Sequence, residues 1–156
     1  MVYLSDEELS GLKNYKYNVV EDSIAEKLMN PFWNWAVRLL PMWMAPNLVT
    51  LIGLLIVVGS SMLFLPFDLE MKDAFPTWTY FFSAAAVFTY MTMDVQDGKQ
   101  ARRTGSSSPL GQMFDHGCDA WSCNFLIYLP LQIFRIGLSP VSGLYYFALT
   151  GIFYAA

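Results

Sequence analysis

Four of the thirteen acidic residues of this 156-residue chain fall in one short stretch, at or near the ends of apolar segments: Asp94, Asp97, Asp115 and Asp119. If the apolar segment that precedes Asp94 continues as a helix, Asp94 and Asp97 lie within an arc of about 100° on one face. Asp115 and Asp119 are four residues apart and therefore also share one helical stripe. A short turn between two such helices makes them antiparallel neighbours. We therefore expect the two pairs of carboxylates to converge.

Carboxylates packed this closely repel one another, and Arg102 supplies at most one compensating charge. Divalent cations are the simplest remedy, because an all-oxygen ligand set suits Mg²⁺ or Mn²⁺. The single histidine and the two cysteines, Cys118 and Cys123, have neither the spacing of a zinc site nor that of a disulfide framework. Two ions about 4 Å apart on shared carboxylates are a recurrent arrangement in phosphoryl transfer. The residues therefore predict a site for two Mg²⁺ or Mn²⁺ ions.

Small residues accompany the first pair of acids. Gly98 lies one turn after Asp94, and Ala101 continues the same face. Glycine inside a helix costs about 1 kcal/mol relative to alanine, so its presence needs a reason. The two interpretations are room for a ligand against the backbone and close packing with another helix. Because Gly98 and Ala101 lie beside the acids, we favour the interpretation that they make room for a ligand.

Long, predominantly apolar segments surround these residues. The chain is 55% hydrophobic and only 14% charged, with a mean hydropathy of +0.37, whereas average soluble domains are about 25% charged. A membrane span needs roughly 20 predominantly apolar residues, and four segments approach this length: residues 45–66, 76–93, 109–136 and 140–156. We therefore expect an all-α fold, a polytopic transmembrane helical bundle. The net charge of −4 argues against a nucleic-acid-binding protein.

Two parts of the chain are expected to differ in their surroundings. Residues 1–44 form a cytosolic N-terminal segment, without the pattern of a cleaved signal peptide, and residues 45–156 form the transmembrane core. Ser5 and Glu8 have the spacing of a capping box, which predicts a short surface helix. The tryptophan-rich residues 23–43 are typical of a helix lying among lipid headgroups. A buried helix covering the end of the bundle is the alternative.

Basic residues set the expected orientation. They lie before the first span and between the second and third, while the intervening loop carries Lys72 alone. By the positive-inside rule, the N-terminus and residues 94–108 face the cytosol. Pro46 suits a helix start, and Pro130 predicts a kink. Since the last span reaches Ala156 without a cap or polar tail, we expect a truncated core of about four spans.

The order of these residues resembles a known signature. Asp94-x2-Asp97-Gly98-x2-Ala101-Arg102-x8-Gly111-x3-Asp115-x3-Asp119 agrees at every fixed position with that of the CDP-alcohol phosphotransferases. The surrounding DGKQARRTGSSSPLGQMFDHGCDAWSC is similar to the eukaryotic choline and ethanolamine phosphotransferase branch, and its WSC leans toward the ethanolamine type. The segment APNLVT, residues 45–50, also resembles the start of the family's first span. The resemblance covers nearly the whole chain, but only the N-terminal part of the longer eukaryotic members.

The resemblance implies roles for individual residues. The four aspartates would hold the two metal ions. The substrate-binding set would be Asn47, Gly98, Ala101, Arg102 and Gly111, with the small residues making room for the cytidine nucleotide and Arg102 pairing with its phosphates.

The catalytic base is left open between His116 and Asp119. We favour His116, because histidine titrates near neutrality, whereas bound cations depress the pKa of an aspartate. The alternative for a lone histidine is a packing or capping role. Gln112 stands where a glutamate is expected, so it can orient the imidazole but contributes no charge.

The implied activity is transfer of phosphoethanolamine or phosphocholine from CDP-ethanolamine or CDP-choline to diacylglycerol, which forms phosphatidylethanolamine or phosphatidylcholine and CMP. The enzyme would be integral to the endoplasmic reticulum or Golgi membrane, in contact with membrane lipids, with its site facing the cytosol. A homodimer is left open. One alternative is a truncated, inactive form that binds nucleotide or pairs with the full-length enzyme. A metal transporter would explain the aspartates, but not Gly98, Ala101 and Arg102.

Overall fold

The computed structural model describes residues 5–14, 23–64, 67, 74–134, 143–146, 148 and 151. These residues form helices α1 (Asp6–Lys13), α2 (Ile24–Ala36), α3 (Pro46–Met62), α4 (Thr77–Thr104) and α5 (Pro109–Ile133), with a 3-10 turn, η1 (Val37–Leu39). Within this described part there is no strand, so the all-α prediction is confirmed. Most of the fourth expected span, residues 140–156, and the loop containing Lys72 lie outside the described residues.

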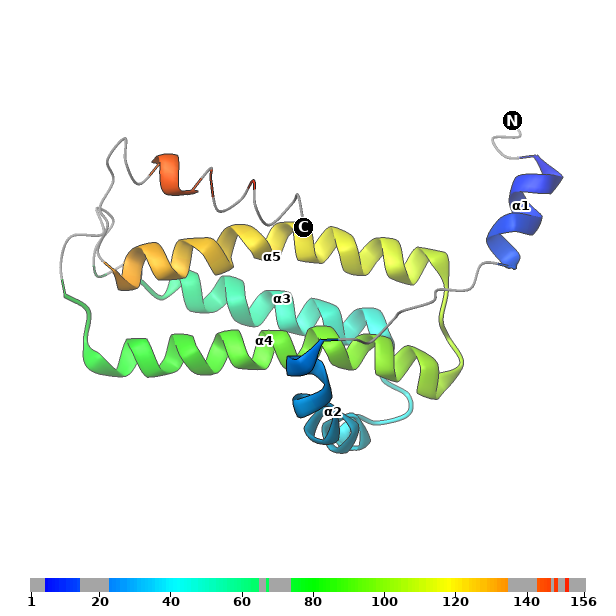
Figure 1. Ribbon diagram of the computed structural model, residues 1–156, viewed down its shortest axis with the longest axis horizontal. Helices are drawn as coiled ribbons and strands as arrows, with labels where there is room; N and C mark the ends of the chain where they lie inside the picture. The colour runs from blue at the N-terminus through cyan, green and yellow to red at the C-terminus, as the bar shows by residue number, and fades with distance from the viewer. Residues whose placement is uncertain are drawn as a thin grey trace.

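The three long helices form a bundle (Figure 1). Helix α3 packs against both α4 and α5, and α2 with η1 packs across α4. Helix α1 stands away from the bundle in the same view. The bundle therefore provides the scaffold, and α2 is attached to one side of it.

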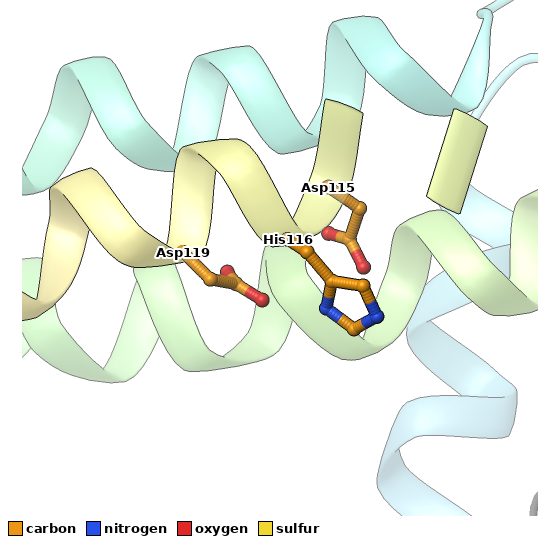
Figure 2. A group of neighbouring side chains, drawn as sticks. All are labelled: Asp115, His116 and Asp119. Carbon is orange, nitrogen blue, oxygen red and sulfur yellow. The ribbon is translucent and has the colours of Figure 1, made fainter. Parts of the chain in front are cut away.

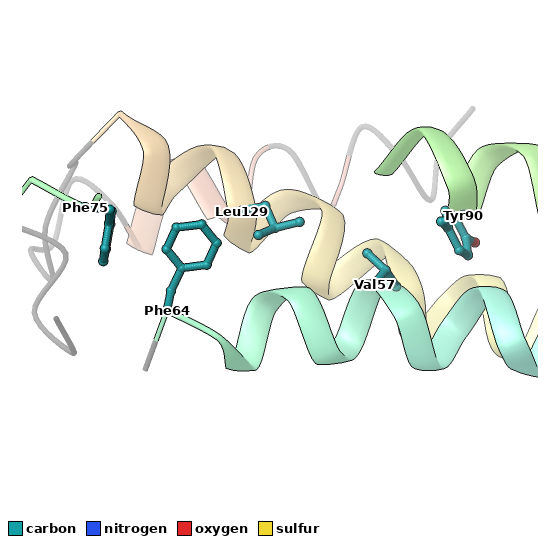
Figure 3. Packing of buried hydrophobic residues seen from close by; sticks show 5 residues of the cluster. All are labelled: Val57, Phe64, Phe75, Tyr90 and Leu129. Atoms are coloured by element: carbon teal, nitrogen blue, oxygen red, sulfur yellow. The ribbon is translucent and has the colours of Figure 1, made fainter. Parts of the chain in front are cut away.

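Aromatic and aliphatic side chains from all three long helices fill the core. Val57 of α3, Tyr90 of α4 and Leu129 of α5 are buried together (Figure 3). Phe64 and Phe75 extend this cluster, with their rings edge to face at a centroid distance of 4.7 Å, a favourable arrangement for two aromatic rings. This core fixes how α4 and α5 face each other.

The turn between α4 and α5 is encoded locally. Gly105 adopts a left-handed conformation, with φ of 66°, directly after the last residue of α4. The amide of Ser106 donates to Ala101 O at 3.0 Å, and that of Gly105 donates to Arg102 O at 3.4 Å. This pattern is a Schellman motif, which uses glycine because it tolerates a positive φ. The chain then reverses into α5, as the short turn predicts.

Several local predictions are met. Pro46 occupies the first turn of α3. Ser5 and Glu8 form the reciprocal capping box at α1: Ser5 N donates to Glu8 Oε2 at 2.7 Å, and Glu8 N donates to Ser5 Oγ at 3.3 Å. These bonds from Ser5 lower the pKa of the Glu8 carboxyl. Pro130 lies inside α5, and the kink there stays a prediction.

The structure bears on two expectations, the membrane spans and the setting of the tryptophan-rich helix α2. The described helices include none that is both long and apolar enough to cross a membrane, in contrast to the four predicted spans. Helix α3, for example, contains 17 residues. Helix α2 has no buried residue, so the alternative of a buried covering helix is wrong. Its contacts with α4 combine a ring contact between Phe32 and Phe88, with centroids 5.8 Å apart, with the polar contacts described below.

Candidate metal centre

Carboxylates from α4 and α5 meet in the bundle. Asp94 lies within hydrogen-bonding reach of Asp119, and Asp97 within that of Asp115. Each pair joins one aspartate of α4 to one of α5. The structure therefore brings together the four aspartates that the helical spacing places on two facing stripes.

The α5 side of this cluster includes a histidine (Figure 2). One ligand atom each of Asp115, His116 and Asp119 lies within 4.8 Å of the others. His116 is exposed, and the amide Nε2 of Gln112 lies 3.4 Å from its Nε2. The imidazole is thus close enough to serve as a metal ligand, a role that the spacing of the acids does not predict.

The surroundings make negative charge costly here. Burial, followed by the charge of Asp119, raises the pKa of Asp94 to about 8. Burial also raises the pKa of Asp97, which is 6% exposed, although hydrogen bonds from Asp115 and Thr50 partly offset this effect. No lysine or arginine among the described residues compensates these carboxylates. The four carboxylates therefore lack a lysine or arginine partner in the described part of the chain, and His116 beside Asp115 can supply at most one positive charge.

One buried carboxylate oxygen shows this shortage of compensating charge most directly. Asp115 Oδ1 is buried and has no hydrogen-bond partner among the described residues. A buried carboxylate oxygen normally has a partner, since leaving it without one costs free energy. An orphaned oxygen within a set of four carboxylates fits a hard divalent cation such as Mg²⁺ or Mn²⁺, which prefers oxygen ligands. The residues present therefore fit the two ions that the signature implies.

Hydroxyl groups orient two of the aspartates. Thr50 of α3 donates to Asp97 Oδ2, and Tyr90 of α4 donates to Asp119 Oδ1 at 2.8 Å. The Tyr90 hydroxyl also lies 2.5 Å from Ser122 Oγ. The motif of acidic and small residues does not predict these hydroxyl groups. The available signal is spacing, because Tyr90 stands one helical turn before Asp94 and Thr50 stands three residues after Asn47.

The predicted substrate-binding residues lie on the same helices as the aspartates or beside them. An added Cβ on Gly98 would touch only Arg102 Nη1, at 3.6 Å, and one on Gly111 would meet Ser108 Oγ at 3.2 Å and Asn47 Oδ1 at 3.5 Å. Asn47 of α3 is therefore near Gly111 of α5, and Arg102 folds back along α4 toward Gly98. Ala101 is half-buried on α4. The structure thus groups the predicted substrate-binding residues on the three helices that carry or support the aspartates.

Comparison with known proteins gives a consistent result. Residues 43–154 match the CDP-alcohol phosphatidyltransferase family. The chain is 41% identical over 150 residues to cholinephosphotransferase 1 of Xenopus laevis, covering 96% of the chain and 37% of that protein. It is also 41% identical over 147 residues to ethanolaminephosphotransferase 1 of Homo sapiens, covering 90% of the chain and 37% of that protein. With choline/ethanolaminephosphotransferase 1 of Arabidopsis thaliana the identity is 44% over 126 residues, covering 80% of the chain and 32% of that protein. The chain thus spans less than two fifths of the length of each of these relatives.

Proposed function

Because this chain belongs to the CDP-alcohol phosphatidyltransferase family, we propose that it forms the donor-binding core of an enzyme that transfers phosphoethanolamine or phosphocholine from the CDP-alcohol to diacylglycerol. The products are phosphatidylethanolamine or phosphatidylcholine and CMP. The observation that carries this proposal is the convergence of four aspartates from α4 and α5, one with an orphaned buried oxygen. The names of the relatives support both headgroups, and the WSC sequence favours ethanolamine.

The donor would be held at its diphosphate and its nucleoside. Asp94, Asp97, Asp115 and Asp119 would hold two Mg²⁺ or Mn²⁺ ions, which neutralise charge on a bound diphosphate and on the departing CMP. Arg102 presents a planar guanidinium that can bind phosphate oxygens in pairs. Gly98 and Ala101 leave the α4 backbone open to the cytidine. Asn47 and Gly111 line the opposite side.

The acceptor hydroxyl needs a proton acceptor. His116 is exposed beside Asp115 and Asp119, with Gln112 next to its Nε2. In the proposed step, a ring nitrogen of His116 takes the hydroxyl proton as the oxygen attacks the β-phosphorus. The new P–O bond forms as the bond to CMP breaks, and CMP leaves with that electron pair. Asp119 is the alternative base, and a direct role of His116 as a ligand would favour it.

A membrane setting belongs to the same proposal. Diacylglycerol is confined to the bilayer, so the site must be accessible at the membrane surface. The α2–η1 segment and the loop after it, residues 24–45, expose large apolar side chains that suit an interfacial position: Ile24, Leu28, Trp35, Leu39, Met42 and Trp43. The proposed location is the endoplasmic reticulum or Golgi membrane, with the site facing the cytosol.

The direct test is a transferase assay of the purified chain in mixed micelles. It would compare CDP-ethanolamine with CDP-choline, with diacylglycerol as acceptor and Mg²⁺ or Mn²⁺ added, and record both lipid product and CMP. His116→Ala should lower turnover by about 10²-fold or more, as expected for loss of a general base, while largely preserving CDP-alcohol binding. Glu7→Gln, an exposed change on α1, is the control.

The outcomes separate the alternatives. Near-normal CMP release by His116→Ala would remove the histidine from the role of base. Binding of the CDP-alcohol without any turnover would favour the nucleotide-binding alternative over the enzyme. Failure to bind any CDP-alcohol in the presence of either metal would contradict the proposed function.

A further inference from the structure

A polar cavity lies away from the aspartates, between the α2–η1 segment and the C-terminal part of α4. It has a volume of about 500 Å³ and is lined by Asn30, Asn34, Val37, Arg38, Lys99, Arg102 and Arg103. Four of these residues are basic and none is acidic. The cavity therefore has the opposite charge to the metal centre.

The cavity occupies a different face of α4 from the aspartates. At about 100° per residue, Lys99 lies about 140° and Arg103 about 180° around the helix from Asp94. Arg102 lies between the two faces and borders both. Lys99, Arg103 and the neighbouring Arg38 are therefore cations that the proposed transfer reaction does not use.

Neutral oxygens hold two of these cations in place. Lys99 Nζ donates to Asn30 Oδ1 at 2.7 Å and to Asn34 Oδ1 at 2.9 Å. Arg103 Nη1 donates to the carbonyl oxygens of Val37 at 2.8 Å and Leu40 at 2.9 Å. These partners fix the position of each cationic group without cancelling its charge. An anion that enters the cavity thus meets side chains that are already ordered, which lowers the entropic cost of binding.

Phosphate chemistry matches this set of groups. Guanidinium groups bind phosphate oxygens in pairs, and a lysine ammonium adds a point charge. A zwitterionic headgroup is less suitable, because its own ammonium group would be repelled by the four basic residues. The cavity therefore favours a phosphate that carries net negative charge.

Exposed apolar side chains in the segment that carries Arg38 indicate the source of that phosphate. Leu39 directly follows Arg38 and is 66% exposed, and Trp43 in the following loop is 77% exposed. A free phosphate would use the cations alone, whereas a lipid would use the cations and this apolar surface together. We propose that the cavity between α2–η1 and α4 binds the phosphate headgroup of an anionic phospholipid. This inference goes beyond the transfer reaction and shares with the proposed function only the membrane setting.

The test measures lipid binding by the purified chain in non-ionic detergent. Phosphatidic acid or phosphatidylcholine with brominated acyl chains is titrated in. Quenching of tryptophan fluorescence reports contact, since Trp33, Trp35 and Trp43 lie in residues 24–45. Phosphatidic acid should quench at lower concentration than phosphatidylcholine. Arg38→Gln together with Lys99→Gln should weaken phosphatidic acid binding about tenfold, because each loses a charge-assisted contact.

Matched variants keep the result interpretable. Lys27→Gln removes a charge from α2 outside the cavity and should leave binding unchanged. Arg38→Gln alone should weaken binding without disturbing α2, because Arg38 is exposed and forms no hydrogen bond with the described residues. Circular dichroism and binding of CDP with Mn²⁺ are measured on every variant, and both should stay at the wild-type level.

Four results would overturn the assignment. They are equal quenching by the two lipids, an equal loss of binding in Lys27→Gln, competition by millimolar inorganic phosphate as effective as that by the lipid, and a parallel loss of CDP binding in the double variant. The third would show a free-anion site, and the fourth would make the cavity an extension of the nucleotide site. Failure of wild-type protein to bind CDP would contradict the proposed function but leave the lipid result standing.

Discussion

The phenolic hydroxyl of Tyr90 donates a hydrogen bond to Asp119 Oδ1 at 2.8 Å, and this bond joins α4 to α5. The ring of the same tyrosine is buried in the hydrophobic core with Val57 and Leu129. One side chain therefore couples the packing of the bundle to the position of a carboxylate. Hydrogen-bonded neighbours of this kind orient metal ligands and tune their affinity.

Tyr90→Phe should separate these two roles. The phenyl ring preserves the packing, whereas the hydrogen bonds to Asp119 and Ser122 are lost. We expect about a 10-fold to 100-fold loss of Mn²⁺ affinity, the range typical for such neighbours of metal ligands, measured by isothermal titration calorimetry. Tyr80→Phe, on the same helix and away from the aspartates, is the control. Unchanged Mn²⁺ affinity in Tyr90→Phe would show that the hydroxyl does not orient Asp119.

Asp94→Asn should stabilise the metal-free protein. Above about pH 8, where Asp94 is ionised, the substitution removes one of four clustered negative charges, and the new amide can donate to Asp119. We expect the free energy of unfolding without metal to rise by about 1 to 2 kcal/mol, a common result when a functional site is relieved of strain. Urea unfolding in chelator measures this, with Glu7→Gln as the exposed control. A destabilised Asp94→Asn protein would contradict the idea of unrelieved repulsion.

Gly53 lies where α3 packs tightly against α4. An added Cβ would lie 3.1 Å from Met93 Cβ, an atom attached to the α4 backbone and unable to move aside alone. We expect Gly53→Ala to lower the free energy of unfolding by about 1 to 2 kcal/mol through overpacking. Gly59→Ala lies on the same helix with nothing within 4 Å, and it should raise stability by up to about 1 kcal/mol. Equal effects of the two substitutions in thermal unfolding would contradict the close packing.

Gly98→Ala should affect ligand binding rather than folding. The added methyl group would touch only Arg102 Nη1, at 3.6 Å, so the fold should tolerate it. It would nevertheless occupy the space proposed for the cytidine nucleotide, and a clash of this kind should weaken CDP binding about tenfold or more. Gly117→Ala on α5, with nothing within 4 Å, is the matched control. If Gly98→Ala binds CDP as the wild type does, Gly98 does not line the nucleotide site.

The sequence is informative about the site where helical spacing alone decides the geometry. Asp94 and Asp97 share a face because α4 continues through them, and Asp115 and Asp119 share one because they are a turn apart on α5. Gly105 and the residues after it make the reversal that brings these faces together. All of this follows from local rules, so it can be predicted without a structure.

What the sequence does not predict depends on the register between helices. Thr50 reaches Asp97 only because α3 packs against α4 at that particular height. The same holds for Gln100, whose Nε2 donates to the carbonyl oxygens of Pro41 and Met44 and so attaches the loop after η1 to α4. Backbone carbonyls carry no residue identity, and a pattern of side chains cannot reveal which of them will be contacted.

The central claim is that α4 and α5 jointly hold two divalent ions, and Mn²⁺ titration followed by electron paramagnetic resonance tests it most directly. Two ions should bind per wild-type chain, as in other two-metal carboxylate sites. Asp97→Asn on α4 and Asp115→Asn on α5 should each weaken or abolish binding of at least one ion, while Glu7→Gln should bind both as before. Absence of saturable Mn²⁺ binding, or binding that neither aspartate variant alters, would contradict the account.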